Sequence, residues 1–182
     1  PIARSNEPDW YGTQRYAIEQ VAALCQEHDC PLLIAGDLFD KWKQPPATIT
    51  FLISMLKEFD TVIAIPGNHD LPNHNYDDME KSAYHTLVAA GVMRTIRPSD
   101  HIRLPDYSNV YGFPCGFNPP CEMESTEEIS YLNIALIHSY IWLEDKYPDA
   151  PEEARFDLYS HKKLKGFDVA CFGDNHAPFC HS

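Results

Sequence analysis

The sequence predicts an α/β fold in which short parallel strands alternate with helices. Two apolar runs, Leu32–Ala35 and Thr61–Ile65, are typical of buried strands, and the amphipathic segment between them is typical of a helix. A strand, a helix and a second strand in this order imply parallel pairing through a right-handed crossover. A chain of 182 residues can bury a core of its own, so we expect a single domain over residues 1–182.

Three helices are expected in the first half of the chain. The first covers Tyr16–His28, because its apolar side chains recur at helical spacing and Pro31 follows its end. The second begins near Pro45. Its apolar stripe consists of Phe51, Leu52, Met55, Leu56 and Phe59. The third covers Asp77–Ala90, and Gly91 stands where a helix often ends in left-handed backbone.

Further strands are expected in the second half. From Val92 to Gly112, three short runs separated by turn residues predict a second sheet edge or a meander. Tyr131–Ile137 and Phe167–Phe172 are apolar and predict two more core strands. Each of them runs directly into a turn that carries histidine or aspartate.

Composition excludes several classes of function. With 27 acidic against 14 basic residues and a net charge of -13, the chain repels phosphate backbones at long range unless metal ions or a partner supply positive charge, so we do not expect a basic nucleic-acid surface on this chain alone. Its apolar runs are far shorter than the ~18 residues of a membrane helix, and no membrane partner is expected. Six cysteines without a C-x-x-C pair predict free thiols in a reducing cytoplasm. We therefore expect a cytoplasmic protein.

Four of the expected strands end in side chains that can bind metal ions or transfer protons. These clusters are Gly36-Asp37-Leu38-Phe39-Asp40, Gly67-Asn68-His69-Asp70, His138, and Gly173-Asp174-Asn175-His176. Since ligands bind at the carboxyl ends of the strands in an α/β sheet, we expect the clusters to converge. Carboxylates, amide oxygens and imidazoles suit hard or borderline divalent ions, and a carboxylate can bridge two of them. Such a pair of ions is typical of phosphoester hydrolysis.

The ordered set GDLFD, GNHD, a strand-terminal histidine and a final G-x-x-H resembles the motifs of the calcineurin-like metallophosphoesterases. The resemblance spans Gly36–His176 and implies a four-layer α/β (α+β) sandwich of two mixed β-sheets flanked by helices. The stretches GDLFDKWKQPP and FGDNH resemble most the DNA-repair exonuclease (SbcD-like) branch and its phage-type relatives. The resemblance implies a DNA or nucleotide phosphoester substrate, and a homodimer and an ATPase as partners.

The resemblance also implies a ligand set for two divalent metal ions. Asp37 would bridge the ions, Asn68 and His138 would bind the second, and His176 would bind the first. Asp174 stands where the family has the first histidine of its G-His-x-His pattern. A carboxylate there favours Mn²⁺, with Zn²⁺, Fe²⁺ and Mg²⁺ as alternatives, if it binds the ion at all rather than supporting a ligand.

Other residues receive roles in catalysis from the same resemblance. His69 would protonate the leaving oxygen or stabilise the transition state, and Asp70 would orient it. We expect Asp40 to support the loop and Arg4 to contact a phosphate group. The remaining histidines lack a strand-end position and are expected on the surface or on helices. They include His28, His74, His85, His101 and His161.

One departure from the family leaves alternatives open. No Asp-x-His motif precedes Asp37, although the family's opening strand carries one that binds the first metal ion. We therefore expect a fragment truncated at both ends, with a weak first metal site. The alternatives are a small-molecule or nucleotide phosphoesterase, a non-catalytic scaffold with a degenerate metal site, and a thiol or zinc protein built on the cysteines.

Overall fold

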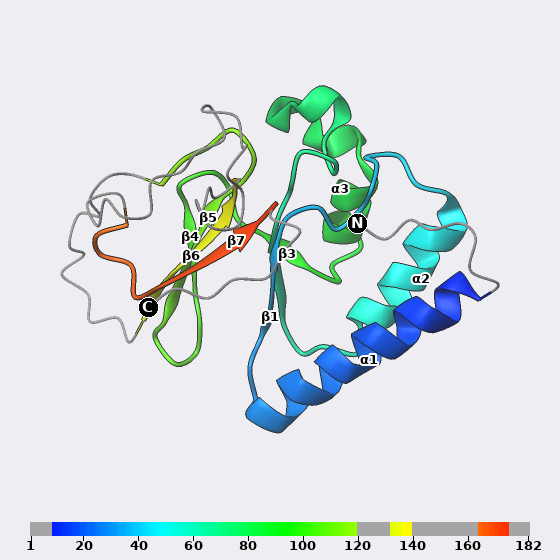
Figure 1. Cartoon of the computed structure of the whole chain (residues 1–182), viewed down its shortest axis with the longest axis horizontal. Helices are drawn as coiled ribbons and strands as arrows, with labels where there is room; N and C mark the ends of the chain where they lie inside the picture. The colour runs from blue at the N-terminus through cyan, green and yellow to red at the C-terminus, as the bar shows by residue number, and fades with distance from the viewer. Residues whose placement is uncertain (1–8, 120–131, 140–163, 175–182) are drawn as a thin grey trace, which may run out of the picture.

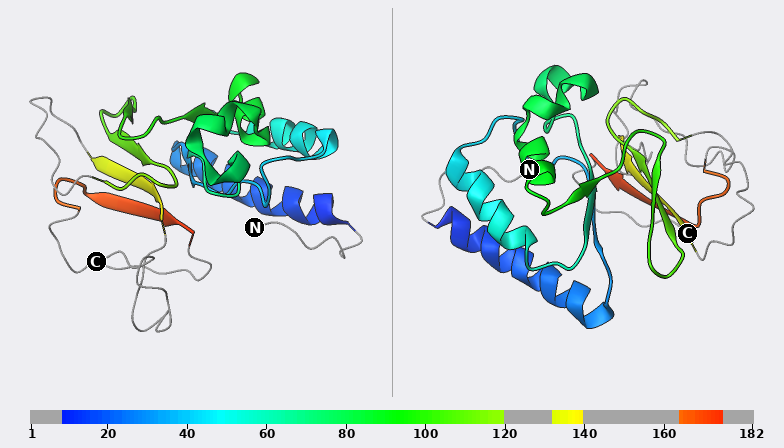
Figure 2. Two further views of the ribbon diagram at one scale, coloured as in Figure 1. Left: turned by 90° about the horizontal axis from the view of Figure 1, so that it is seen from above. Right: turned by 180° about the vertical axis from the view of Figure 1, so that it is seen from behind.

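Two β-sheets lie face to face, and helices cover the outer face of the first sheet (Figure 1). The computed structural model describes residues 9–119, 132–139 and 164–174. Seen from above, the helices, the first sheet and the second sheet follow one another as layers (Figure 2). Two sheets with flanking helices are the arrangement that the sequence predicted, so the expected fold class is confirmed.

The first sheet contains the strands that precede the first two clusters of predicted site residues. It consists of three parallel strands in the order β1-β2-β3, namely β1 (Leu32–Ala35), β2 (Val62–Ile65) and β3 (Arg94–Thr95). Helix α2 (Pro46–Leu56) connects β1 to β2. The predicted strand–helix–strand unit with parallel pairing is therefore confirmed.

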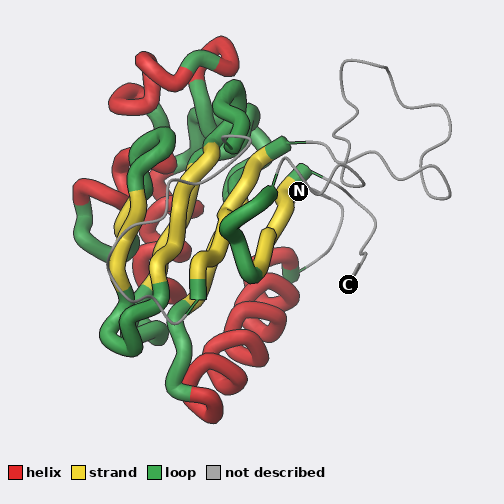
Figure 3. The backbone as a smooth tube through the Cα atoms, turned by 90° about the vertical axis from the view of Figure 1, so that its left-hand side faces the viewer, coloured by secondary structure: helices red, strands yellow, loops and turns green. Residues whose placement is uncertain are grey.

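The second sheet is mixed. Its strands, in spatial order, are β4 (His101–Arg103), β5 (Asn109–Phe113), β6 (Asn133–His138) and β7 (Val169–Gly173). Strand β4 is antiparallel to β5, whereas β5, β6 and β7 run parallel. Figure 3, in which this sheet faces the viewer, shows the strands in front of the helices. The two core strands predicted in the second half of the chain are confirmed as β6 and β7.

The segment from Val92 to Gly112 is divided between the two sheets. Its first run supplies β3 to the first sheet, and its other two runs form the β4–β5 pair of the second sheet. The prediction of a sheet edge holds for β4, but no single meander contains all three runs. The reason is that β3 is joined in parallel to β2, a pairing that local turn residues do not reveal.

Alternation along the strands assigns each face of the first sheet to a different core. Val62 and Ala64 of β2 face the helices, while Ile63 and Ile65 point between the two sheets. The helical core also contains Ala22, Leu52, Leu56, Tyr84 and Leu87. The core between the sheets also contains Ile96, Ile102, Val110 and Leu136. Because β2 is buried on both faces, its carboxyl end has a fixed position.

Helix α1 (Trp10–His28) begins earlier than the sequence predicted. The carboxylate of Asp9 accepts the backbone N–H of Gly12 at 3.0 Å and caps the helix. The added turn packs its aromatic side chains on α2, where the Tyr11 and Phe51 ring centroids lie 5.0 Å apart.

No helix in the described ranges is long and apolar enough to cross a membrane.

The prediction of one helix over Asp77–Ala90 is wrong. The segment consists of a 3₁₀ helix, η2 (Tyr76–Lys81), followed by α3 (Ala83–Ala89). Ser82 separates them, because its backbone is extended and its hydroxyl accepts the N–H of His85 at 3.1 Å. A serine that caps a new helix favours this break over one continuous helix. Gly91 follows α3 with φ +70, as expected for the residue after a helix.

We predict that Gly112→Ala destabilises the fold. Gly112 lies in β5 between the sheets, where an added Cβ would come within 2.6 Å of the Ile96 Cβ and 3.1 Å of the Ile65 Cγ2. Separating the sheets to relieve this overlap should lower the free energy of unfolding by about 1–3 kcal/mol. Urea unfolding measures the loss. Val169→Ala, on an exposed position of the same sheet, should change it by less than about 0.5 kcal/mol, and equal effects would contradict the prediction.

Candidate metal centre

The carboxyl ends of four strands meet at one edge of the two sheets, as the sequence predicted. Asp37 follows β1, and Asn68 and His69 follow β2. His138 is the last residue of β6, and Asp174 follows β7. The side chains therefore come from both sheets and meet where β1 of the first sheet contacts β6 and β7 of the second.

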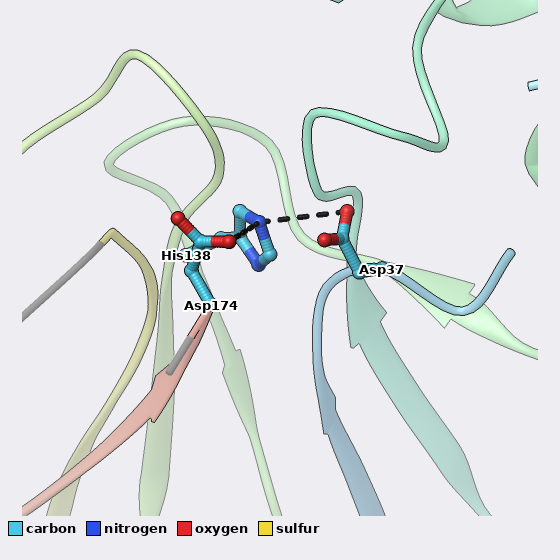
Figure 4. Close-up of side chains that lie close together, drawn as sticks. All are labelled: Asp37, His138 and Asp174. Carbon is cyan, nitrogen blue, oxygen red and sulfur yellow. Dashed lines mark ion pairs between the residues drawn. The ribbon is translucent and has the colours of Figure 1, made fainter. Parts of the chain in front are cut away.

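Asp37, His138 and Asp174 form a cluster that could hold a metal ion (Figure 4). One ligand atom from each lies within 4.8 Å of the others. The Nε2 atom of His138 lies 3.5 Å from the Asp37 Oδ1 and 4.0 Å from the Asp174 Oδ1. The imidazole of His138 is buried, whereas both carboxylates are half-buried. The structure thus brings together three of the residues that the sequence singled out.

The orientation of His138 is fixed by a hydrogen bond between the two sheets. Its Nδ1 lies 2.7 Å from the backbone carbonyl oxygen of Ala35, which can only accept, so Nδ1 carries a proton and donates it. In the neutral ring, Nε2 then has a free lone pair. A donor bond from the other ring nitrogen is the usual support of a metal-binding histidine.

The lone pair of His138 faces other acceptors. The Oδ1 of Asn68 lies 3.0 Å from Nε2, and the carboxylates of Asp37 and Asp174 approach from the sides. Acceptors that converge in this way repel one another unless a second proton on the imidazole or a bound cation lies among them. Two carboxylates, an amide oxygen and an imidazole are a donor set for hard or borderline divalent ions. The residues present therefore fit a divalent metal ion.

Three glycines surround the His138 imidazole and give it room. A Cβ at Gly36 would overlap the ring, and a Cβ at Gly67 would lie 2.7 Å from the ring Cε1. A Cβ at Gly173 would lie 2.8 Å from the ring Nδ1 and would also overlap the carbonyl oxygen of Ala35. Each motif glycine therefore permits close approach of the backbone to His138.

The two carboxylates of the cluster extend from left-handed backbone. Asp37 has φ +51 and Asp174 has φ +109. Residues other than glycine pay a steric cost in this region, and such positions gather at functional sites where the surrounding structure enforces them. The backbone turns sharply at both strand ends, which directs the two side chains toward His138.

Asp70 has a different role from the one we expected. Its buried carboxylate accepts the backbone N–H of Gly67 at 3.0 Å, of Phe39 at 2.9 Å and of Leu38 at 3.2 Å. The pKa of Asp70 is raised to about 6, mainly by burial and to a smaller extent by the nearby Asp37, while the three hydrogen bonds act in the opposite direction. Asp70 therefore ties the loop after β1 to the loop after β2.

His69 is oriented by a main-chain group rather than by Asp70, which corrects the expected contact. Its Nδ1 lies 3.0 Å from the backbone carbonyl oxygen of Asp40 and donates to it. Its backbone N–H donates to the Asp37 Oδ1 at 3.0 Å. The contact of Asp40 with His69 is made by its backbone carbonyl and not by its side chain. The ring of His69 is exposed, with Nε2 turned away from this bond, so a ligand can reach it.

His74 is exposed, as expected for a surface histidine, and it also contacts the loop after β2. Its Nδ1 lies 3.0 Å from the backbone carbonyl oxygen of Asn68, and its ring stands edge-on to that of His69 at 6.2 Å. Asn73 and His74 both have left-handed backbone, with φ +53 and +56. The Pro-Asn-His sequence after GNHD is a turn signal that could have indicated this approach.

Sequence reasoning did not predict that Cys115 lies near the metal cluster. It follows β5, and its thiol lies close enough to the metal cluster to sense its charge. Burial raises the pKa of Cys115, and the negative charges of Asp174 and Asp37 raise it further. The sequence gives no periodic signal for this position, because the residue belongs to an irregular segment.

Two predicted site residues lie outside the described residues. They are His176, expected to bind the first metal ion, and Arg4, expected to contact a phosphate group. Their roles stay predictions, as do the metal roles assigned to Asp37, Asn68 and His138 individually.

Comparison with known proteins agrees with the geometry. The sequence profile described as calcineurin-like phosphoesterase matches residues 9–179. The match covers every strand-end cluster, from Gly36 to His176. Among curated proteins, none matches the chain.

We predict that Gly173→Ala weakens metal binding. The new Cβ would displace the His138 ring from Ala35 and turn Nε2 away from the cluster. The affinity for Mn²⁺, measured by isothermal titration calorimetry, should fall by about 10- to 100-fold. The control is Gly91→Ala, outside the cluster, where an added Cβ meets nothing within 4 Å and the cost is that of left-handed backbone at φ +70. An unchanged affinity in a folded Gly173→Ala protein would contradict this role for the glycine.

We predict that Asp70 makes the metal-free protein less stable as the pH rises from about 4 to about 6. Because folding raises the pKa of Asp70 from 3.8 to about 6, the folded state holds this proton more tightly than the unfolded state. This contribution is fully present below about pH 4 and is lost as the pH passes 6, for a total of up to about 3 kcal/mol.

Urea unfolding of the wild type and Asp70→Asn measures this dependence. The stability of the wild type relative to the variant should fall across the interval, because the amide does not titrate. A difference that stays constant from about pH 4 to 6 would show that the pKa of Asp70 is not raised.

Proposed function

Since the chain belongs to the calcineurin-like phosphoesterase family, we propose that it hydrolyses phosphodiesters and that its substrate is DNA. The family implies metal-dependent hydrolysis of phosphoester bonds. One observation carries the proposal for this chain: the lone pair of His138 converges with the oxygens of Asp37, Asn68 and Asp174. Convergent acceptors of this kind are suited to a divalent cation.

The metal-holding residues follow from this geometry. His138 would bind through Nε2, and Asp37, Asn68 and Asp174 would bind through oxygen atoms. Divalent ions bound there would polarise the phosphoryl group and lower the pKa of the attacking water. We propose Mn²⁺ as the ion, because three of the four donors are oxygen atoms.

His69 is suited to act on the leaving group. The bond from Nδ1 to the Asp40 carbonyl fixes the ring, and its exposure leaves Nε2 accessible to a substrate. When the ring carries a second proton, Nε2 can donate it to the leaving oxygen. The backbone N–H of His69 holds Asp37 at the same time, so the acid and the carboxylate keep a fixed separation.

The proposal of a DNA substrate is based on the sequence motifs rather than on charge. The stretch from Gly36 to Pro46 is similar to that of DNA-repair exonucleases, and Lys41 and Lys43 are exposed directly after the loop that carries Asp37. The net charge of -13 opposes long-range attraction of a polyanion. That charge favours a second candidate, a small nucleotide or other soluble phosphoester.

We predict that His69→Ala lowers turnover without lowering metal affinity. The assay is hydrolysis of bis-p-nitrophenyl phosphate with Mn²⁺, and chelation by EDTA should abolish it. Loss of the proton donor should lower kcat by about 10²- to 10⁴-fold, while calorimetry shows an unchanged Kd for Mn²⁺. His28→Ala is the control, because His28 is exposed at the far end of α1. Equal turnover in both variants would contradict a catalytic role for His69.

The substrate class is tested by comparing esters. A DNA phosphodiesterase should hydrolyse bis-p-nitrophenyl phosphate and single-stranded DNA faster than the monoester p-nitrophenyl phosphate. Hydrolysis of the monoester alone would contradict the DNA proposal and favour the small-molecule candidate. Binding of Mn²⁺ without hydrolysis of any of the three would favour a non-catalytic scaffold.

A further inference from the structure

Two cysteines outside the metal centre lie side by side at the end of α1. Cys25 is in the last turn of the helix, and Cys30 lies between the helix and β1. Their side chains contact each other through a hydrogen bond. Cys25 is half-buried, whereas Cys30 is exposed. The metal centre is at the opposite end of β1, so the pair is a separate feature of the fold.

The backbone explains why the two thiols meet. The N–H of Cys30 donates to the carbonyl of Cys25 at 3.0 Å, and the N–H of Asp29 donates to the carbonyl of Gln26 at 3.4 Å. Asp29 between them is left-handed, with φ 49 and ψ 49. These features define a Schellman motif, in which the side chains at the two positions occupied here by Cys25 and Cys30 commonly touch.

We propose that Cys25 and Cys30 form a reversible dithiol–disulfide site that reacts with small disulfides such as glutathione disulfide. A disulfide requires Cα atoms about 4.4–6.8 Å apart, and two residues joined by their own main-chain hydrogen bond are held close together. The helix cap therefore presents both thiols to each other before any reaction occurs. Exposure of Cys30 gives the reagent access to the pair.

The reaction has a defined order. The exposed Cys30 thiolate attacks one sulfur of glutathione disulfide, the bond between the two glutathione sulfurs breaks, and one glutathione thiolate leaves. Cys25 then gives up its proton to solvent and attacks the Cys30 sulfur, which releases the second glutathione. Two protein thiols are oxidised to one disulfide, and one glutathione disulfide is reduced to two glutathiones.

The environment of Cys25 places it second in this order. Burial raises the pKa of the Cys25 thiol, and the adjacent Cys30 raises it further, both by charge and by the hydrogen bond between the side chains. The thiolate of Cys25 is therefore less populated than that of an ordinary cysteine, which disfavours Cys25 as the first attacking group. Once Cys30 carries glutathione, Cys25 is the thiol closest to the new disulfide.

Mass spectrometry of one tryptic peptide tests the proposal. Cleavage after Arg15 and Lys41 releases a peptide that contains Cys25 and Cys30 and no other cysteine. After incubation with glutathione disulfide, acid quenching and alkylation, the peptide should lack both alkyl groups and be lighter than the dithiol by two hydrogen atoms. Dithiothreitol should restore the doubly alkylated form.

Unfolding provides the first control, because sequence proximity alone could bring the cysteines together. In urea, at the same ratio of glutathione to glutathione disulfide, the ratio of disulfide to dithiol should fall by about tenfold or more, since the helix cap is lost. Equal ratios in the folded and unfolded protein would overturn the proposal. A folded peptide that stays doubly alkylated, or that stops at mixed disulfides, would overturn it as well.

Two single variants test the order of the reaction. Cys25→Ser should stop with glutathione on Cys30, because no second thiol can displace it. Cys30→Ser should react with glutathione disulfide more slowly, because the remaining thiol is half-buried and burial still raises its pKa. Equal rates in two folded variants would contradict the assignment of Cys30 as the attacking residue.

Discussion

The hydrogen bond from His138 to the Ala35 carbonyl is the contact on which the site depends. It joins the last residue of β6 to the last residue of β1, so it links the two sheets at the edge where the ligands gather. It also decides which nitrogen of the ring is protonated, and therefore which nitrogen faces the carboxylates. Gly36 and Gly173 are needed because an added Cβ would overlap the His138 ring at Gly36 and the Ala35 carbonyl oxygen at Gly173.

The other residues of the site make energetically unfavourable interactions around that bond. Asp37 and Asp174 have left-handed backbone, and their carboxylates approach the Nε2 of His138. Asp70 is a buried carboxylate held by three backbone donors, and it keeps the first two ligand loops together. A bound cation would offset the repulsion among the acceptors, so metal binding and folding stability should be coupled.

Much of the fold could be predicted because burial follows a simple period. The β2 strand is apolar at every position since both of its faces are buried, and its parallel partner follows from the intervening helix. The edge at which the clusters converge follows from the same topology. The break at Ser82 could not be predicted from periodicity, because a single hydroxyl that caps α3 outweighs a continuous helical pattern.

Side-chain partners within the site were less predictable than its location. The carbonyl of Asp40 orients His69, and the carbonyl of Asn68 holds His74. Main-chain acceptors carry no residue-type signal, so sequence alone cannot distinguish them from the carboxylate of Asp70. The approach of Cys115 to the cluster likewise depends on the tertiary path of an irregular segment.

The most direct test of the central claim is anomalous X-ray diffraction from crystals of this chain soaked in Mn²⁺. We expect an anomalous peak within bonding distance of the His138 Nε2, with Asp37, Asn68 and Asp174 among its other neighbours. A peak elsewhere, or a structure in which His138 donates from Nε2 to Asn68 with no ion beside it, would contradict the assignment of these strand ends as a metal centre.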